Sequence, residues 1–370
     1  MENVMGIINL HENEEMLREV TKHRPLAAVP FAGRYRIIDF VLSSMVNSGI
    51  HNVGILVSNK YRALMDHLRS GKEWDLARKR DGLFILPPAE SQQGKPQSDI
   101  DNLFSNLDYI KSSRQQYVLI TGSSIICNLN FKKAFQFHQT KQADITVLYK
   151  ELDSRQEDFK HSTIIDCDDQ GRVVDMAVNP VKVTSNKVFM KMCIMSKDLL
   201  VDIITGCAAR GSTDLLMDGL VKNIGKLAIY GYQYKGFMAR IHSVPSYYRH
   251  SMELLKPEKW QELFFKSGPV YTKVKDEAPV KYKESACINN AMIANGCVIE
   301  GAVENSILFR GVTVGPGAYI KDSIIMQKCQ VGANARLENV ICDKDVAITD
   351  GKWLKGESTY PLVIAKGTVI

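Results

Sequence analysis

The chain lacks long hydrophobic runs, closely paired cysteines, and any histidine after His250. No apolar stretch in its 370 residues approaches the ~20 residues of a membrane span, and the N-terminus has no signal-peptide pattern. The eight cysteines form no Cys-x-x-Cys pair and no zinc spacing with histidine. Several lie inside apolar runs, Cys193 among them, so we expect buried, reduced thiols. These absences favour a cytoplasmic protein without a membrane partner.

Charge and hydrophobicity are ordinary for a globular protein, at 24% charged and 45% hydrophobic residues. The net charge is +6, but Lys and Arg are dispersed among acids, and the densest basic run is residues 77–80. Such a run is typical of a solvated loop. We therefore expect no nucleic-acid partner, and local Arg and Lys groups suit anionic metabolites instead.

The first two-thirds of the chain alternates buried strands with amphipathic helices. Apolar runs predict strands over 3–9, 53–57, 117–121 and 144–149, and helical spacing predicts helices over 35–48 and 61–68. Gly49 lies where the first helix should end. This α/β pattern indicates a mainly parallel mixed sheet covered on both faces, with ligands beyond the carboxyl ends of its strands.

The last ninety residues carry a repeat. Similar pentapeptides start at Glu304, Lys321 and Glu338, 17 residues apart, and apolar residues recur six apart within each unit, as in Val314 and Ile320. A six-residue apolar repeat is typical of a parallel β-helix, with alternation in an antiparallel sheet as the alternative. We predict an α/β domain over 1–245, a proline-punctuated connector over 246–284, and the β-helix over 285–370.

Four segments carry a resemblance to a known family. The runs 24–40 and 42–50 resemble ADP-glucose pyrophosphorylase, which is glucose-1-phosphate adenylyltransferase, and 247–255 and 269–272 extend the match. The resemblance implies a Rossmann-like (GT-A-like) nucleotidyltransferase domain followed by a left-handed β-helix, commonly in a tetramer. The family joins ATP and glucose 1-phosphate into ADP-glucose and diphosphate, using Mg²⁺.

The loop that wraps the triphosphate in that family is glycine-rich, whereas no glycine occurs here between Leu10 and Arg24. A backbone that approaches phosphates closely needs residues without a Cβ. Side chains occupy the equivalent positions here, in place of the family's glycines and arginine: His11, Glu12, Glu14 and Met16. Leu26 replaces a cationic residue of the family.

Further family positions are altered in the rest of the domain. Ser123 stands where the family has a metal-binding aspartate, and Arg240 stands at the second metal carboxylate. Asn179 replaces a lysine that holds the sugar phosphate in the family, and Phe189 replaces a residue whose hydroxyl holds the glucose ring. A hydroxyl and a cation are poor ligands for Mg²⁺. We expect no catalytic residue, no metal and no cofactor in this chain, with Mg²⁺ in a catalytic partner.

Arginines near the retained motif are candidates for binding a phosphorylated sugar effector. Arg34 lies where the family has an activator-binding lysine, and Arg36 and Arg24 flank it. Guanidinium groups bind phosphate with two hydrogen bonds. The alternative is that Arg34 and Arg36 pair with Asp39 or cap local structure.

Other conspicuous residues receive plainer interpretations. Asp99 and Asp101 are interpreted as a helix N-cap, not as a metal pair. His242 and His250 are expected at the surface. The three tryptophans are expected to pack: Trp74, Trp260 and Trp353.

The resemblance and the altered positions together suggest a non-catalytic subunit that forms a hetero-oligomer, expected to be a tetramer, with a catalytic paralogue in glycogen synthesis. An active nucleotidyltransferase with a divergent site and a free-standing sugar-phosphate sensor are the alternatives. Hexapeptide solenoids also occur in acyltransferases, which usually need a histidine on the solenoid, and none follows His250. The solenoid is therefore interpreted as structural.

Overall fold

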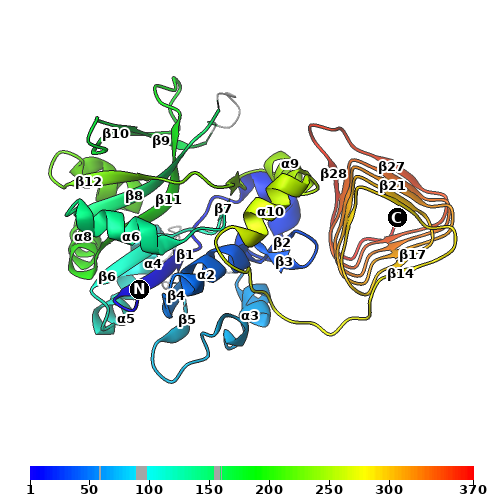
Figure 1. The fold of residues 1–370 in the computed structure, drawn as a ribbon, viewed down its shortest axis with the longest axis horizontal. Helices are drawn as coiled ribbons and strands as arrows, with labels where there is room; N and C mark the ends of the chain where they lie inside the picture. The colour runs from blue at the N-terminus through cyan, green and yellow to red at the C-terminus, as the bar shows by residue number, and fades with distance from the viewer. Residues whose placement is uncertain (58–59, 89–97, 154–158, 160) are drawn as a thin grey trace.

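A computed structural model describes residues 1–57, 60–88, 98–153, 159 and 161–370. Two bodies lie side by side in Figure 1, an α/β domain and a triangular β-helix, joined by helices α9 (Val244–Glu253) and α10 (Pro257–Phe265) and an extended segment. The predicted fold class is confirmed: a nucleotidyltransferase-type α/β domain followed by a left-handed β-helix.

A nine-stranded mixed sheet forms the centre of the α/β domain, in the order β10-β9-β11-β6-β1-β4-β5, with β8 and β12 attached through β11. Its strands are β1 (Val4–Asn9), β4 (Asn52–Leu56), β5 (Gly82–Leu86), β6 (Tyr117–Thr121), β8 (Ile145–Glu151), β9 (Thr163–Cys167), β10 (Val173–Val178), β11 (Lys187–Ser196) and β12 (Ile229–Gln233). Two small pairs lie outside it, β2 (Pro30–Phe31) with β3 (Tyr35–Arg36) and β7 (Ile125–Ile126) with β13 (Ala239–Arg240). The helices are α1 (Arg18–Thr21), α2 (Ile37–Asn47), α3 (Arg62–Leu68), α4 (Asp99–Ser105), α5 (Leu107–Ser112), α6 (Phe131–Thr140) and α8 (Lys197–Ala209).

The parallel half of the sheet follows the sequence prediction. Strands β6, β1, β4 and β5 are parallel neighbours, and the buried aliphatic runs of β1, β4 and β6 are typical of strands covered on both faces. Helix α2 is buried on all sides from Ile37 to Met45 and ends before Gly49, whose φ of +83° is a conformation that glycine adopts readily. The second half of the sheet differs, because β11 runs antiparallel to β6 and β8.

The β-helix has three five-stranded faces. One consists of β14 (Lys281–Tyr282), β17 (Val298–Ile299), β20 (Thr313–Val314), β23 (Gln330–Val331) and β26 (Ala347–Ile348). The second consists of β15 (Cys287–Asn289), β18 (Ala302–Glu304), β21 (Tyr319–Lys321), β24 (Arg336–Glu338) and β27 (Trp353–Lys355). The third consists of β16 (Met292–Ile293), β19 (Ile307–Leu308), β22 (Ile324–Ile325), β25 (Val340–Cys342) and β28 (Leu362–Ile364).

One corner of the β-helix is a ladder of polar residues with positive φ. Asn290, Asn305, Asp322 and Asn339 occupy equivalent places in successive coils, with φ between 44° and 53°. Asparagine and aspartate tolerate this left-handed conformation better than most residues. The amide of Asn290 donates to Asn305 at 2.9 Å, and Asn305 donates to Asp322. The repeat thus turns its corner by a backbone conformation that the side chains help to stabilise.

The third face of the β-helix packs against the α/β domain (Figure 1). Ile307, Ile324 and Ile341 belong to one buried cluster with Leu26 and Phe31 of the α/β domain. The hydroxyl of Tyr248 on α9 donates to the Asp322 carbonyl at 2.6 Å. The two bodies therefore share a continuous apolar core. Strand β14 already pairs with β17, so the solenoid begins a few residues before the predicted 285, and residue 245 lies within α9.

The cysteines follow the prediction with two exceptions. None of the eight forms a disulfide; six are buried, while Cys167 is partly exposed and Cys287 exposed. Burial raises the pKa of the Cys193 thiol to about 12. None of the helices in the described part of the chain is both long and apolar enough to cross a membrane.

Candidate functional site

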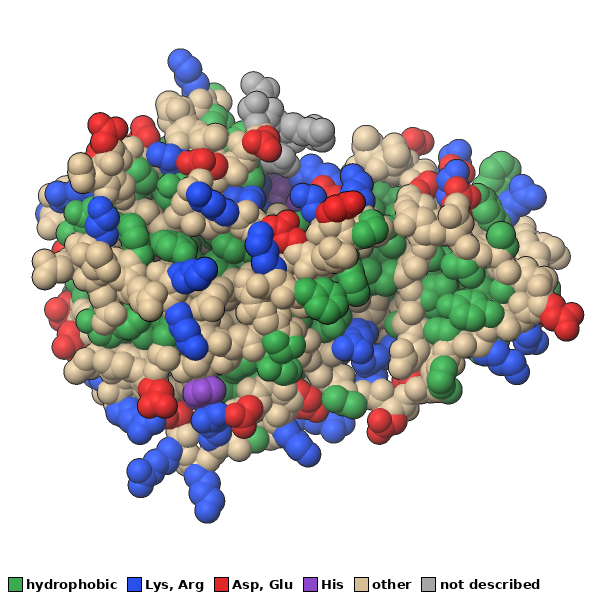
Figure 2. Space-filling model, in the orientation of Figure 1, with side chains coloured by type: hydrophobic (Ala, Val, Ile, Leu, Met, Phe, Trp, Pro, Cys, Tyr) green, Lys and Arg blue, Asp and Glu red, His purple; other side chains and the backbone are tan. Residues whose placement is uncertain are grey.

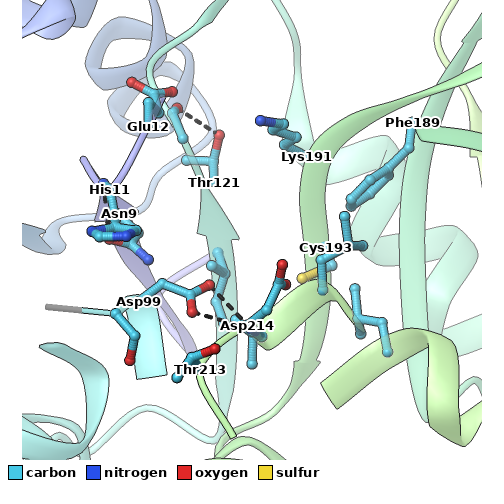
Figure 3. Close-up of a pocket in the computed structure, with 16 residues that line it drawn as sticks. Asn9, His11, Glu12, Asp99, Thr121, Phe189, Lys191, Cys193, Thr213 and Asp214 are labelled. Carbon is cyan, nitrogen blue, oxygen red and sulfur yellow. Dashed lines mark hydrogen bonds between the residues drawn. The ribbon is translucent and has the colours of Figure 1, made fainter. Parts of the chain in front are cut away.

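A cavity of about 500 Å³ lies beyond the carboxyl ends of parallel strands β1 and β6 (Figure 3), where ligands bind in open α/β sheets. We call it the sheet-edge cavity. Residues from five segments line it: Asn9, His11, Glu12, Ser98, Asp99, Ile120, Thr121, Gly122, Phe189, Lys191, Cys193, Thr213, Asp214, Leu215, Leu216 and Leu220.

The Glu12 side chain fills an anion cradle at one end of this cavity. Its carboxylate accepts hydrogen bonds from the main-chain N–H groups of Ser123 and Ser124, at 2.7 and 2.5 Å, and from the Ser123 hydroxyl at 2.5 Å. Main-chain N–H groups that converge on one point are a common way to hold an anion. Here that anion belongs to the chain itself. The predicted altered positions Glu12 and Ser123 are therefore direct partners, which no spacing in the sequence indicated.

Gly122 makes room for this contact, because a Cβ there would lie 2.7 Å from Glu12 Oε1. Glu14, in the same loop, has a similar role: its Oε1 accepts from the Leu26 N–H at 2.5 Å, and Lys60 lies 3.8 Å from its Oε2. Burial raises the pKa of Glu14. Glu12 and Glu14 thus bind the chain's own N–H groups, and the loop offers carboxylates where a phosphate would need donors.

The opposite end of the cavity is acidic. Both oxygens of Asp99 lie 3.1 Å from the Leu215 N–H, and Asp214 caps the helical turn Leu215–Leu220. Burial raises the pKa of Asp99 to about 6, so it is mostly ionised at neutral pH. Burial also lowers the pKa of His11, which leaves that ring neutral. Lys191 faces Glu12 across the cavity in Figure 3. Carboxylates thus outnumber cations around the space.

The other predicted positions are not brought into this cavity, except Phe189, which lines its apolar side. Arg240 lies on β13, donates to the His161 carbonyl at 3.0 Å, and lines a second cavity of about 580 Å³. Met16 is exposed beside a third cavity, and Leu26 is buried in the shared core. Asn179 is exposed at the end of β10 and lines none of these three cavities.

The altered family positions supply no carboxylate for Mg²⁺. A serine and an arginine stand where the family resemblance places the two metal carboxylates, and Glu12 already accepts three hydrogen bonds. Mg²⁺ needs charged oxygen ligands in near-octahedral geometry. In the described ranges no three His, Cys, Asp or Glu side chains gather in a group that could hold a metal ion.

The structure separates the three arginines that were predicted to bind an effector. Arg24 is 3% exposed and pairs with Asp343 of the β-helix at 2.6 Å, beside the Met326 sulfur. An effector from solvent does not reach it, so this residue is corrected to an interdomain contact. Arg36 donates to the Ala63 carbonyl at 2.8 Å, and its own N–H donates to Asp39 at 2.9 Å. Arg36 therefore has the local role at the start of α2 that the sequence left open, and its guanidinium also lies near Lys275 and Lys344.

Arg34 is exposed, stacked over the Tyr35 ring at 5.1 Å, and belongs to a basic group at the domain junction. Lys and Arg side chains gather where the two bodies meet (Figure 2). Burial, and then repulsion from neighbouring cations, lower the pKa of Lys275, near Arg310 and Arg36, and of Arg310, near Arg34, while Glu277 opposes both shifts. Burial, and then Arg36, lower the pKa of Lys344 to about 7. We call these five residues the junction cluster: Arg34, Arg36, Lys275, Arg310 and Lys344.

Sequence reasoning missed the members of this cluster beyond Arg34 and Arg36. They come from the connector and two coils of the β-helix, so no local pattern joins them.

Two of the plainer interpretations need correction. The N-cap of α4 is Ser98, and Asp101 completes its capping box, while Asp99 is the first helical residue. His242, expected at the surface, is half-buried, and burial with Arg240 lowers its pKa to about 4.

Fold and site together define a protein of the nucleotidyltransferase class. A model described as nucleotidyl transferase matches residues 15–251, and one described as GlmU-like, C-terminal hexapeptide matches residues 277–357. The chain belongs to the ADP-glucose pyrophosphorylase family.

Within the family it is similar to proteins named glycogen biosynthesis protein GlgD. It is 41% identical to that of Bacillus subtilis (strain 168), over 99% of this chain and 96% of that protein, and 42% identical to that of Geobacillus stearothermophilus, over 99% and 97%. It is 31% identical to the glucose-1-phosphate adenylyltransferase of Bacillus mycoides (strain KBAB4), over 95% of each chain.

Proposed function

We propose that the chain acts in glycogen biosynthesis as a non-catalytic, regulatory subunit of glucose-1-phosphate adenylyltransferase. The observation that carries the proposal is the Glu12 carboxylate on the N–H groups of Ser123 and Ser124. A triphosphate would have to displace a carboxylate that already accepts three hydrogen bonds, and would meet its charge at close range. The names of the similar GlgD proteins support the pathway.

The altered positions support the proposal that this chain does not catalyse the reaction itself. In-line attack on an α-phosphorus needs cations on the departing diphosphate and usually a bound metal. Ser123 and Arg240 supply no carboxylate for Mg²⁺, and in this proposal the catalytic paralogue supplies both the metal site and the turnover. The shared core between the two bodies would let the β-helix transmit contacts with that paralogue.

The junction cluster is the proposed effector site, and a phosphorylated sugar is its proposed ligand. Arg34 offers an exposed guanidinium group and Arg310 a half-buried one, and Lys275 adds an exposed cation from the connector. Since these residues come from both bodies and the connector, an anion bound there would couple their positions.

An assay of the purified chain, alone and mixed with the catalytic paralogue from the same genome, tests the proposal. We expect no ADP-glucose formation by the lone chain, co-elution with the paralogue, and a change in the paralogue's kcat or effector response. Turnover by the lone chain near that of the complex would overturn it. Binding of a sugar phosphate without co-elution and without any kinetic change would instead favour a free-standing sensor.

A matched pair of variants separates the effector site from the oligomer. R34Q/R310Q should abolish the response to glucose 6-phosphate but keep co-elution, whereas K79Q, in the solvated basic run, should change neither. An unchanged effector response in R34Q/R310Q would contradict the site.

A further inference from the structure

The second face of the β-helix is flat, exposed and turned away from the α/β domain (Figure 1). We call it the outer face; it consists of β15, β18, β21, β24 and β27. In β18, β21, β24 and β27 the middle residue points into the solenoid and the two flanking residues point outward. The outward residues of successive coils form two columns, because the strands pair in register.

The first column alternates in charge. It contains Glu304, Lys321, Glu338 and Lys355, in register from coil to coil. Within the chain, Lys321 lies 3.8 Å from Glu304, and Lys355 lies 3.2 Å from Glu338. All four side chains are at least one-third exposed and can reach a partner outside the chain, although Glu304 also accepts a hydrogen bond from the Tyr319 hydroxyl at 2.5 Å. Exposed pairs of this kind contribute little to stability by themselves.

The second column combines a small residue, aromatic rings and a cation: Ala302, Tyr319, Arg336 and Trp353. Trp353 is 68% exposed, although tryptophan packing was expected from the sequence, whereas Trp74 is buried. An exposed tryptophan beside an arginine is a composition enriched at protein interfaces.

Reversing the coil order gives each column its complement. Suppose that a second copy of the chain faces the first with its coils in the opposite order. Because the column alternates in charge and has four members, each charge then lies opposite one of the other sign: Glu304 faces Lys355, and Lys321 faces Glu338. In the second column, the same reversal sets Ala302 against Trp353 and Tyr319 against Arg336. A small residue then faces the largest one, and a guanidinium faces an aromatic ring.

A two-fold axis parallel to the strands, between β21 and β24, produces this reversal. It places two outer faces against each other with their solenoid axes antiparallel, and each column then faces its own copy. Two-fold interfaces are self-complementary in this way. We propose that the outer face is the interface through which a second copy of this chain binds.

The face is small. Four coils at ~4.8 Å span about 19 Å along the solenoid, so the interface belongs to the smaller size class, and we expect a dissociation constant on the order of micromolar. Sedimentation velocity between about 1 and 200 µM therefore covers the expected transition. Polar contacts of this kind also predict weaker association at high salt.

Two single charge reversals test the pairing. E304K sets a lysine opposite Lys355 of the second copy, and K355E sets a glutamate opposite Glu304. We expect each variant to dimerise at least 10-fold more weakly than the wild type. In an equimolar mixture, each E304K chain meets a K355E chain with both cross-pairs opposite in charge, so the mixture should regain wild-type association. The double variant E304K/K355E should regain it as well.

The melting temperature of each variant is an independent control for its folding. Each reversal also breaks an ion pair within its own chain, and E304K removes the acceptor of the Tyr319 hydroxyl as well. The melting temperatures of the variants should therefore fall and stay low in the mixture, whereas association recovers. W353A should weaken the dimer, and W260A, on the exposed side of α10, should leave it unchanged. A wild-type chain that stays monomeric to 200 µM, or a mixture that associates no better than the single variants, would overturn the proposal.

Discussion

At the scale of single residues, the Glu12 cradle separates this chain from an enzyme of its family. Replacing Glu12 with alanine leaves the N–H groups of Ser123 and Ser124 without their acceptor, and both residues are buried. We expect E12A to lower the free energy of unfolding by about 1–3 kcal/mol, measured by urea denaturation.

The same variant should also gain affinity for inorganic phosphate, measured by calorimetry, because the emptied cradle presents two main-chain donors. E12Q is the matched control: its amide oxygen still accepts, so it should unfold nearer to the wild type and gain less phosphate affinity. Equal phosphate binding by wild type and E12A would show that the carboxylate does not occupy an anion site.

Arg24 is the second residue whose role the structure defines. Its pair with Asp343 is buried on both sides, and removing one partner of such a pair leaves an uncompensated charge. We expect R24A to destabilise the chain by about 3–5 kcal/mol in urea. The double variant R24M/D343L replaces the pair with apolar groups and should recover most of this loss. If R24A alone were as stable as the wild type, the buried pair would not hold the two bodies together.

At the scale of elements, the polar corner of the β-helix depends on backbone conformation. Asn305 has a φ of +44° and exchanges side-chain hydrogen bonds with its neighbours in the ladder. N305A should cost about 1–2 kcal/mol, since alanine tolerates a positive φ less well than asparagine and the ladder is broken. N305G keeps the φ and loses only the ladder, so its melting temperature should lie between those of N305A and the wild type. A melting temperature of N305G below that of N305A would contradict this division.

Elements with a local signal could be predicted from the sequence. Helix α2 has an apolar face and a glycine stop, and the coils of the β-helix repeat every 17 residues, so both were found. The antiparallel β11 was not anticipated, because a buried strand reads the same in either direction. The altered positions were located by resemblance, but the Glu12–Ser123 contact joins residues 111 apart, and only the fold brings them together.

At the scale of the whole molecule, the junction cluster should make anion binding depend on pH. Lys344 lies close to Arg36 and Arg24, and its pKa of about 7 means that it is only partly protonated at neutral pH. An anion bound in the cluster would favour the charged form and raise this pKa, so binding should take up a proton. The uptake applies above pH 7, where the free lysine is mostly neutral, and vanishes below it, where the lysine already carries its proton.

Affinity for an anion should therefore fall as the pH rises from 7 to 9. Sulfate is the appropriate probe, since its charge is constant over this range, and calorimetry in buffers of different ionisation heat counts the protons taken up. K344M removes the titrating group and should bind sulfate with a flatter pH profile, while K366M, whose lysine lies near Lys344 at an exposed position, should keep the wild-type slope. A wild-type affinity that stays constant from pH 7 to 9 would place the bound anion away from Lys344. The anion would then not couple the two bodies through this cluster.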